Sequence, residues 1–295
     1  MNIIRAVTWI AGIVICASVF LLVVHLSANN MEFSRYNAGW NGTSSFFFDL
    51  DRHQTIDIRK PGELAGYPGN TTLLIIAPHR APTTEELAAY SAFLKDGNTI
   101  FLADDFGTGN AILAGIGSRI TILPGNLSSL DRAYPDPYSV IVYRATEDGP
   151  VPLPVSLALN RPAPLEGGSS LMLSSVMSWV DLNGDKRLNL GEGMGTFPVM
   201  TTETVGSGRI IVLSDPSIFI NSMYSQAENA NNREFLKTFA SPKGPLLIDQ
   251  MNSRSADANG FSGILHVLRN TISIELIIIG ALLLGTAWAW KKKAI

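Results

Sequence analysis

The sequence predicts an α/β domain with a mostly parallel sheet flanked by helices, and one transmembrane helix at each end of the chain. The domain is predicted by a strand, a helix and a strand in succession over residues 72–103, and by a further apolar strand over residues 208–214. The membrane helices are predicted by apolar runs of about 20 residues near both ends.

The two apolar runs cover residues 6–27 and 272–290. The first has no charged side chain, and the second has only Glu275. A cleaved signal peptide is the alternative for the first run, but the run is longer than the roughly 7–15 apolar residues of a signal peptide. We therefore expect an uncleaved membrane helix at each end of the chain.

Basic residues beside the two runs predict the orientation in the membrane. Arg5 precedes the first run, and lysines 291–293 follow the second. The positive-inside rule then places residues 1–5 and the basic tail 291–295 in the cytoplasm. The main domain, residues 28–250, is expected to lie outside the cytoplasm, held at the cell membrane.

Composition limits what this domain can do. The formal net charge is −3 and no cluster of Lys and Arg occurs outside the basic tail, which argues against nucleic acid as a partner. Cys16 is the only cysteine and lies in the first apolar run, so the exterior domain has no disulfide, cysteine metal site or cysteine nucleophile. Sequons at Asn41, Asn70 and Asn126 allow N-glycosylation on the exterior side.

A βαβ unit is the clearest local pattern. The apolar run 72–77, ended by a proline, is typical of a buried parallel strand. Thr83 and Glu86 have the spacing of a capping box that begins a helix, and Gly97 is placed to end it. Residues 99–103 predict the second strand, which should lie parallel to the first with a right-handed crossover.

Weaker patterns predict the other elements. These are a helix that begins at 42–44, strands at 55–58 and 208–214, and a helix at 231–239. Residues 124–168 are rich in proline and in short alternating runs, which predicts a β-rich insertion, with an extension of the main sheet as the alternative. Residues 251–271 contain an amphipathic segment that either packs on the domain or lies on the membrane surface.

Residues 181–192 match the twelve-residue calcium-binding loop. The predicted ligands are the side chains of Asp181, Asn183, Asp185, Asn189 and Glu192 and the backbone carbonyl of Arg187. Lys186 stands where such loops need glycine, and Gly191 and Gly193 disfavour a helix after the loop. We predict a single loop that binds Ca²⁺, with a turn that binds nothing as the alternative.

Polar residues follow the ends of the predicted parallel strands, which is where ligands bind in open α/β sheets. The candidate ligand-binding residues are His79, Asp104, Asp105, Gly107, Thr108, Asn110, Asp215, Ser217 and Asn221. Such groups bind a metal, a sugar hydroxyl or a phosphate. The alternative is that they cap helices and turn the chain.

In the order of these motifs, the chain resembles an uncharacterised family of archaeal membrane-anchored proteins. Its exterior domain is similar to the class I glutamine amidotransferase fold, which is a flavodoxin-like arrangement. The resemblance rests on residues 36–44, 74–78, 102–110, 181–192 and 208–221, with Asn231. It implies a non-catalytic binding or scaffold domain, of the kind found in auxiliary subunits of gliding-motility-type ABC export systems. Where amidotransferases carry their cysteine nucleophile, this chain has Asp104 and Asp105.

The leading functional prediction is a non-catalytic, membrane-anchored binding or scaffold domain. It would serve as an accessory subunit of a cell-envelope or ABC-transport-type complex, with envelope membrane proteins or a second copy of itself as partners. An enzyme is not favoured, because no nucleophile is paired with a histidine in the exterior domain. The alternatives are a metal-assisted hydrolase that uses Asp105 and Asp215 on a cell-surface substrate, and a calcium-stabilised structural surface protein.

Overall fold

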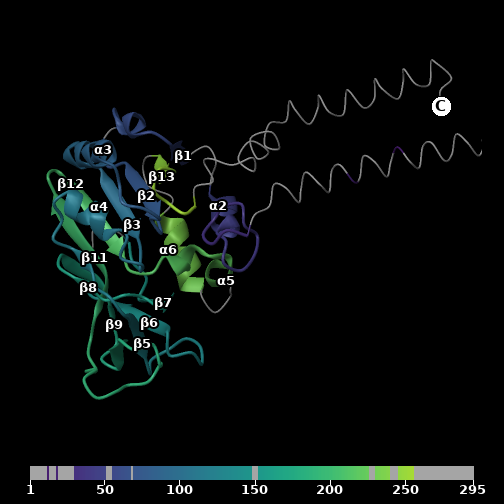
Figure 1. Cartoon of the computed structure of the whole chain (residues 1–295), viewed down its shortest axis with the longest axis vertical. Coiled ribbons are helices and arrows are strands. Elements are labelled where there is room, and N and C mark those ends of the chain that lie inside the picture. Colours follow the sequence, from purple (N-terminus) through teal and green to yellow (C-terminus); the bar gives the residue numbers. More distant parts are fainter. Residues whose placement is uncertain are drawn as a thin grey trace, which may run out of the picture. The chain divides into compact units, whose positions relative to one another are not determined.

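A computed structural model gives the structure of this chain (Figure 1). It describes residues 12, 18, 30–50, 55–67, 69–147, 152–225, 230–239 and 245–255. Apart from the first two, all of these residues belong to one unit, Asn30–Ala256.

A nine-stranded sheet in the order β1-β13-β2-β3-β12-β11-β9-β6-β7 forms the centre of this unit. Its strands are β1 (Thr55–Ile58), β2 (Thr72–Ile76), β3 (Thr99–Ala103), β6 (Ser139–Arg144), β7 (Ser156–Asn160), β9 (Ser169–Ser174), β11 (Pro198–Val205), β12 (Gly208–Leu213) and β13 (Leu246–Asp249). There are also two small antiparallel sheets of two strands each. One pairs β10 (Ser178–Asp181) with β5 (Asn126–Ser129), and the other pairs β4 (Thr121–Ile122) with β8 (Leu165–Glu166).

In the described part of the chain, the helices are few and mostly short. They are α2 (Ser44–Asp49), α3 (Thr84–Lys95), α4 (Asn110–Gly115), α5 (Asn221–Tyr224) and α6 (Ala230–Phe239), with 3₁₀ turns η1 (Pro61–Leu64) and η2 (Pro216–Phe219).

The prediction of a mostly parallel sheet flanked by helices is wrong, because the sheet is mixed. The strands from β1 to β12 in the sheet order run parallel, whereas β11, β9, β6 and β7 are antiparallel to their neighbours. Only Gly206 and Ser207 separate β11 from β12, and a two-residue connection can join only antiparallel strands. With this sheet-rich architecture, the resemblance to the amidotransferase fold is not supported.

The predicted membrane topology also needs correction. Residues 6–27 and 272–290, predicted as transmembrane helices, lie outside the described residues except for residues 12 and 18, as do the predicted cytoplasmic ends. In the part of the chain that the structure describes, no helix combines the length and the apolar character needed to span a membrane. The two-pass topology, the cell-membrane localisation and the exterior placement therefore find no support.

The predicted βαβ unit is confirmed. Strands β2 and β3 pair in parallel over their whole length, and α3 connects them. The capping box forms as expected: the Glu86 N–H donates to Thr83 Oγ1 at 3.2 Å, and the Thr83 N–H donates to Glu86 Oε2 at 2.8 Å. Gly97 follows the helix with a left-handed φ of 84°, a conformation that glycine adopts without a steric cost.

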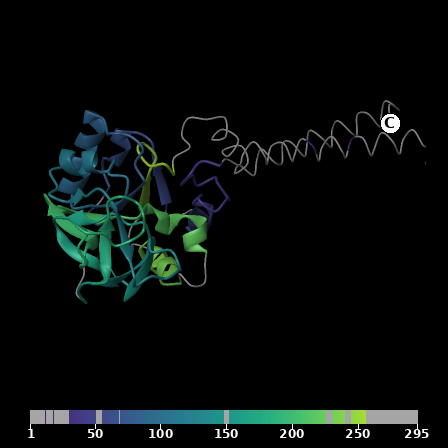
Figure 2. The ribbon, with the colours of Figure 1, turned by 60° about the horizontal axis from the view of Figure 1, so that its bottom comes forward.

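Two apolar cores lie on opposite faces of the sheet. On β2, Leu74 and Ile76 pack in the core that also contains residues of α2, α5 and α6, whereas Leu73 and Ile75 pack in the core under α3 and α4. Figure 2 shows these two helix groups from a second direction. Every residue of β2 is buried, which explains the nearly continuous apolar run over residues 72–77.

Side chains from α6 cover the outer edge of β7. Asn232 accepts a hydrogen bond from the Ala158 N–H at 3.0 Å and donates to the Ala158 carbonyl at 2.7 Å. The neighbouring Asn231 donates to the Ser156 carbonyl at 3.3 Å. These amides satisfy backbone groups that an exposed edge strand would present to another chain.

Candidate functional site

The ends of β3 and β12 bring three of the predicted carboxylates together. The two strands are adjacent and parallel, and the Asp104 N–H donates to the Leu213 carbonyl at 3.0 Å. Burial, together with the charges of Asp215 and Asp104, raises the pKa of Asp105 to about 8. Burial also raises the pKa of Asp215 to about 6 and moves the pKa of Asp104 upward. Among the residues that the structure describes, a buried oxygen of Asp105, Oδ1, has no hydrogen-bond partner.

The other two carboxylates are used to fix the backbone. Asp215 accepts hydrogen bonds from the N–H groups of Ser217 and Asn160, at 2.7 and 2.6 Å. Asp104 accepts from the N–H groups of Phe106 and Gly109, at 3.1 and 2.7 Å. These contacts are the capping and turn-forming roles that stood as the alternative to ligand binding.

The remaining residues of the loop after β3 hold it against β4. Asn110 accepts from the Ile122 N–H at 2.8 Å and donates to the Ile122 carbonyl at 2.9 Å. Gly107 has a left-handed φ of 79°, and its carbonyl accepts from the Asn110 N–H. The carbonyl of Thr108 accepts from the Ala111 N–H. The loop is thus closed by its own hydrogen bonds.

Asn221 and His79 contact other parts of the chain. The Asn221 amide donates to the carbonyls of Asn37 and Gly39, at 3.1 and 2.7 Å, and accepts from the Ser45 N–H at 2.8 Å. His79 is exposed, and its Nδ1 lies 2.7 Å from the carbonyl oxygen of Asn252. Among the described residues, neither side chain is hydrogen-bonded to the three carboxylates. Ligand binding by these candidate residues stays a prediction.

The predicted calcium loop begins at the end of β10 and is closed by internal hydrogen bonds. Asp181 accepts from the Gly184 and Lys186 N–H groups, both at 2.7 Å, and from the Tyr138 hydroxyl at 2.8 Å. Lys186 has a left-handed φ of 63°, the conformation for which such loops normally use glycine.

The other predicted ligands bond to one another. Asn183 Oδ1 accepts from the Asp185 N–H at 3.0 Å, and Asp185 accepts from the Arg187 N–H at 2.9 Å. Asn189 donates to both Asp185 and the Arg187 carbonyl, and Glu192 accepts from the Asn189 N–H at 3.0 Å. Over the described part of the chain, no group of three or more His, Cys, Asp or Glu side chains is arranged to hold a metal ion. Calcium binding by this loop stays a prediction.

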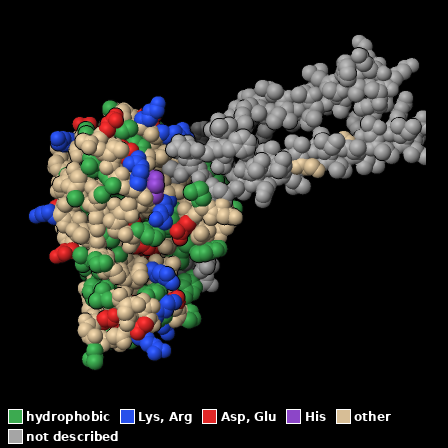
Figure 3. All heavy atoms as spheres, viewed as in Figure 1, with side chains coloured by type: hydrophobic (Ala, Val, Ile, Leu, Met, Phe, Trp, Pro, Cys, Tyr) green, Lys and Arg blue, Asp and Glu red, His purple; other side chains and the backbone are tan. Residues whose placement is uncertain are grey.

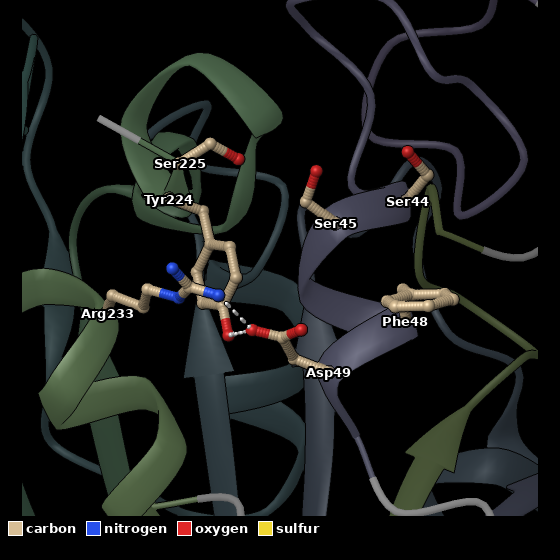
Figure 4. A pocket seen from close by; sticks show the side chains of 7 residues that line it. All are labelled: Ser44, Ser45, Phe48, Asp49, Tyr224, Ser225 and Arg233. Atoms are coloured by element: carbon tan, nitrogen blue, oxygen red, sulfur yellow. Dashed lines mark hydrogen bonds and ion pairs between the residues drawn. The ribbon is translucent and has the colours of Figure 1, made fainter. Parts of the chain in front are cut away.

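A cleft of about 360 Å³ lies between α2 on one side and α5 and α6 on the other (Figure 4). Its lining residues are Ser44, Ser45, Phe48, Asp49, Tyr224, Ser225 and Arg233. Figure 4 shows Asp49 pointing from α2 across to Tyr224 and Arg233, with Phe48 beside it on the same helix.

An ion-pair network lines this cleft. Asp49 accepts from the Tyr224 hydroxyl at 2.9 Å and from Arg233 at 2.7 Å, and Lys237 Nζ lies 3.3 Å from the same oxygen. Burial favours the neutral carboxyl, but the hydrogen bonds from Arg233, Tyr224 and Lys237 outweigh it and hold the pKa of Asp49 below its ordinary value. Burial and the bond to Asp49 raise the pKa of Tyr224 to about 12. The network therefore carries one negative and two positive charges.

Two aromatic side chains of this region are exposed to solvent. Phe48 is 82% exposed at the cleft, and Trp40, on the loop before α2, is 70% exposed. The carbonyl of Trp40 accepts from the N–H of Ser222 in α5, which holds the loop beside the same helix. The cleft thus combines exposed aromatic surface with a fixed charge network.

The cleft residues were not among the sequence candidates, although one local signal was present. Phe46, Phe47 and Phe48 follow one another in a helix, where two positions correspond to a rotation of about 200°. Because Phe46 is buried, Phe48 must point away from the core. By contrast, no sequence signal identifies Arg233 as the partner of Asp49.

Comparisons with known proteins give a family but no activity. No curated protein matches the chain. The mmIFT52 N-terminal domain is 13% identical, with a TM-score of 0.44, over 61% of this chain and 80% of that chain. Cytoplasmic protein STM1381 from Salmonella typhimurium LT2 is 14% identical, with a TM-score of 0.32, over 63% of this chain and 76% of that chain.

A third solved structure shares less of its length with this chain. The β-galactosidase from Bacillus circulans sp. alkalophilus is 12% identical, with a TM-score of 0.34, over 56% of this chain and 22% of that chain. At these scores the likenesses carry no functional argument. Residues 35–236, more than half of the sequence, match a family by their own pattern, and the chain belongs to that family, which is described as Domain of unknown function (DUF4350).

Proposed function

We propose that this protein is a non-catalytic binding domain that takes up a segment of a partner protein in the Phe48 cleft. It would act as an accessory subunit of a larger complex. The observation that carries this proposal is the exposure of Phe48 at the cleft. A large aromatic side chain in water beside a rigid charge network is the composition found at the energetic centre of protein interfaces.

The charges of the cleft favour an acidic partner segment. Asp49 is already paired, so the exposed guanidinium of Arg233 and the exposed ammonium of Lys237 leave one positive charge in excess. A peptide with an apolar side chain next to a carboxylate would cover Phe48 and neutralise that excess. Burial of Phe48 alone would contribute about 1.5–3 kcal/mol.

The alternative functions have less support in the geometry. For a metal-assisted hydrolase, Asp215 would have to bind a metal or a water, but both of its oxygens accept backbone hydrogen bonds. A calcium-stabilised structural protein rests on the 181–192 loop, for which calcium binding stays a prediction. The archaeal origin implied by the sequence resemblance stays a prediction as well.

Site-specific crosslinking tests the proposal. A photo-reactive amino acid placed at position 48 should crosslink one defined partner in the cells that make the protein. The same group at position 190 should not crosslink it, because Leu190 is fully exposed (106%) but lies outside the cleft. The partner is identified by mass spectrometry, purified and titrated against variants of the chain.

The titration decides between the outcomes. Phe48→Ala should weaken binding by about 2 kcal/mol or more, roughly thirtyfold, and Lys237→Gln should weaken it less. Leu190→Ala is the matched control and should leave affinity unchanged. Equal losses in Phe48→Ala and Leu190→Ala contradict the proposal. Crosslinks only to a second copy of this chain would replace it with self-association.

A further inference from the structure

A second cleft, of about 640 Å³, lies at the end of the sheet where β11 turns into β12. Its polar lining residues are Arg119, Ser169, Thr202, Glu203, Thr204 and Arg209. We propose that this cleft binds the phosphate group of a small organic molecule. It is separate from the Phe48 cleft, with which it shares no lining residue.

Arg209 provides the main observation. It lies opposite Thr204 in the β11–β12 pair, and its side chain is half-buried. Within the described part of the chain, its guanidinium has neither a hydrogen bond nor an ion pair. A half-buried cation without a partner loses hydration and gains no compensating contact, so the position favours an anion.

Arg119 supplies a second guanidinium that is already oriented. Its Nε donates to Glu203 Oε1 at 2.7 Å and its backbone N–H to Oε2 at 2.8 Å, while Ser118 donates to Oε2 at 2.7 Å. Burial alone would favour the neutral form of Glu203, but the bonds from Arg119 and Ser118 hold its pKa below the ordinary value. The ion pair with Glu203 uses only the Nε of the Arg119 side chain, which is 85% exposed. Both terminal amino groups of Arg119 therefore remain available to bind an anion.

Hydroxyl groups complete the lining. Thr202 Oγ1 already donates to the Ile210 carbonyl at 3.0 Å, whereas Thr204 and Ser169 are exposed. Ser169 lies opposite Thr202 in the β9–β11 pair, and Thr204 follows two residues later on the same face of β11. Two hydroxyl donors therefore stand on the face that carries Arg209.

A glycine pair brings the turn before β9 close to these groups. Gly167 and Gly168 both have left-handed φ angles, of 84° and 69°. A Cβ at Gly167 would lie 2.3 Å from the Arg119 carbonyl oxygen, and one at Gly168 would lie 2.9 Å from the Thr202 carbonyl oxygen. Glycine is thus required for the turn to form this wall of the cleft.

Charge and size identify the class of ligand. The two guanidinium groups and one carboxylate that line the cleft leave a net charge of +1. Guanidinium groups match the oxygen geometry of phosphate. The volume lies in the range of about 300–1,000 Å³ typical of small-molecule sites, which is larger than inorganic phosphate alone needs. The remaining space would hold the organic part.

Calorimetric titration of the full-length protein tests this site, with inorganic phosphate and glycerol 3-phosphate as probes. Both should bind saturably, and glycerol 3-phosphate should bind more tightly. Arg209→Met should raise the Kd about tenfold or more, because it removes a charge-assisted contact. Arg209→Lys, which keeps the charge but not the fork geometry, should give an intermediate Kd.

Arg132→Met is the matched control, because Arg132 is exposed and lies outside the cleft. It should leave the Kd unchanged. Thr204→Val is a second cleft variant, which keeps the test valid if Arg209→Met fails to fold, and it should weaken binding severalfold. Absence of saturable binding overturns the proposal. An equal loss in Arg132→Met and Arg209→Met also overturns it, since that result would indicate nonspecific attraction to charge.

Discussion

Replacing Asp105 with asparagine should change how the stability of this domain depends on pH. The Asp105 carboxyl is half-buried beside Asp215 and Asp104, and these surroundings raise its pKa to about 8. Glu32 adds a smaller repulsion. In the unfolded chain its pKa returns to about 3.9. Between pH 4 and pH 8, the folded state therefore keeps a proton that the unfolded state has released.

The sign and the size of the effect follow from this difference. The free energy of unfolding falls as pH rises through that window, by at most about 1.4 kcal/mol per pH unit for one proton. Asp105 is only half-buried, and the exposed part of its loop lowers the cost of ionisation. We therefore expect a loss of about 2–3 kcal/mol between pH 5 and pH 9.

Urea denaturation at pH 5, 7 and 9 measures this effect. Wild-type protein should lose stability across the series, whereas Asp105→Asn, which cannot ionise, should keep most of its stability at pH 9. The matched control is Glu234→Gln, which removes an exposed carboxyl on α6 and should follow the wild type. If the free energy of unfolding changes with pH by the same amount in wild type and in Asp105→Asn between pH 6 and pH 9, water reaches the carboxylates more freely than the structure indicates. That result would refute the prediction.

Three other predictions concern side chains that hold the fold together. Asn221→Ala should lower the free energy of unfolding by about 2–4 kcal/mol, because it leaves the carbonyls of Asn37 and Gly39 and the N–H of Ser45 without their partner. Hydrogen exchange should rise at residues 37–45. Asn232→Ala should lower the free energy of unfolding by about 1–3 kcal/mol. It should also expose the edge of β7 and so promote association between copies of the chain, which light scattering would detect. If the 181–192 loop binds calcium as predicted, Ca²⁺ should raise the melting temperature of wild type but not of Asp185→Ala. An equal rise in both proteins would contradict that prediction.

The parts of the fold that local sequence determines were predictable. The βαβ unit follows from one apolar run, one capping box and one glycine, and each of these signals acts within a few residues. The antiparallel half of the sheet depends on which strand lies beside which. Alternating runs such as 139–144 and 156–160 have the same pattern in an inserted subdomain as in an extension of the main sheet.

The candidate site divides in the same way. The rule that parallel strands end at one edge predicted that Asp104, Asp105 and Asp215 come together, and they do. The rule says nothing about which backbone N–H groups those carboxylates meet. The Phe48 cleft depends on a contact between Asp49 and Arg233, which are 184 residues apart in the chain, so local patterns carry no information about it.

The chain itself fills the place where an open α/β sheet usually binds its ligand. After β13, residues 250–255 run across the ends of β2 and β3: the Arg254 N–H donates to the Ile76 carbonyl at 3.0 Å, and Ser253 forms an antiparallel bridge with Pro78. The Arg254 guanidinium lies 4.3 Å from the ring centre of Phe106, over the loop that contains Asp105.

A buried hydrogen-bond network also holds residues 250–255 in place. Asn252 donates to the Tyr90 hydroxyl at 2.9 Å, and Tyr90 in turn donates to the fully buried Asp249 at 3.0 Å. To open the strand ends to a ligand, the chain would have to break this buried network, at a cost of about 1–3 kcal/mol for each group left unsatisfied. Binding at either of the two clefts requires no such rearrangement. Because of this difference in cost, we expect ligands to bind at the Phe48 cleft and at the second cleft, which contains Arg209. We do not expect them at the carboxylates of the strand ends.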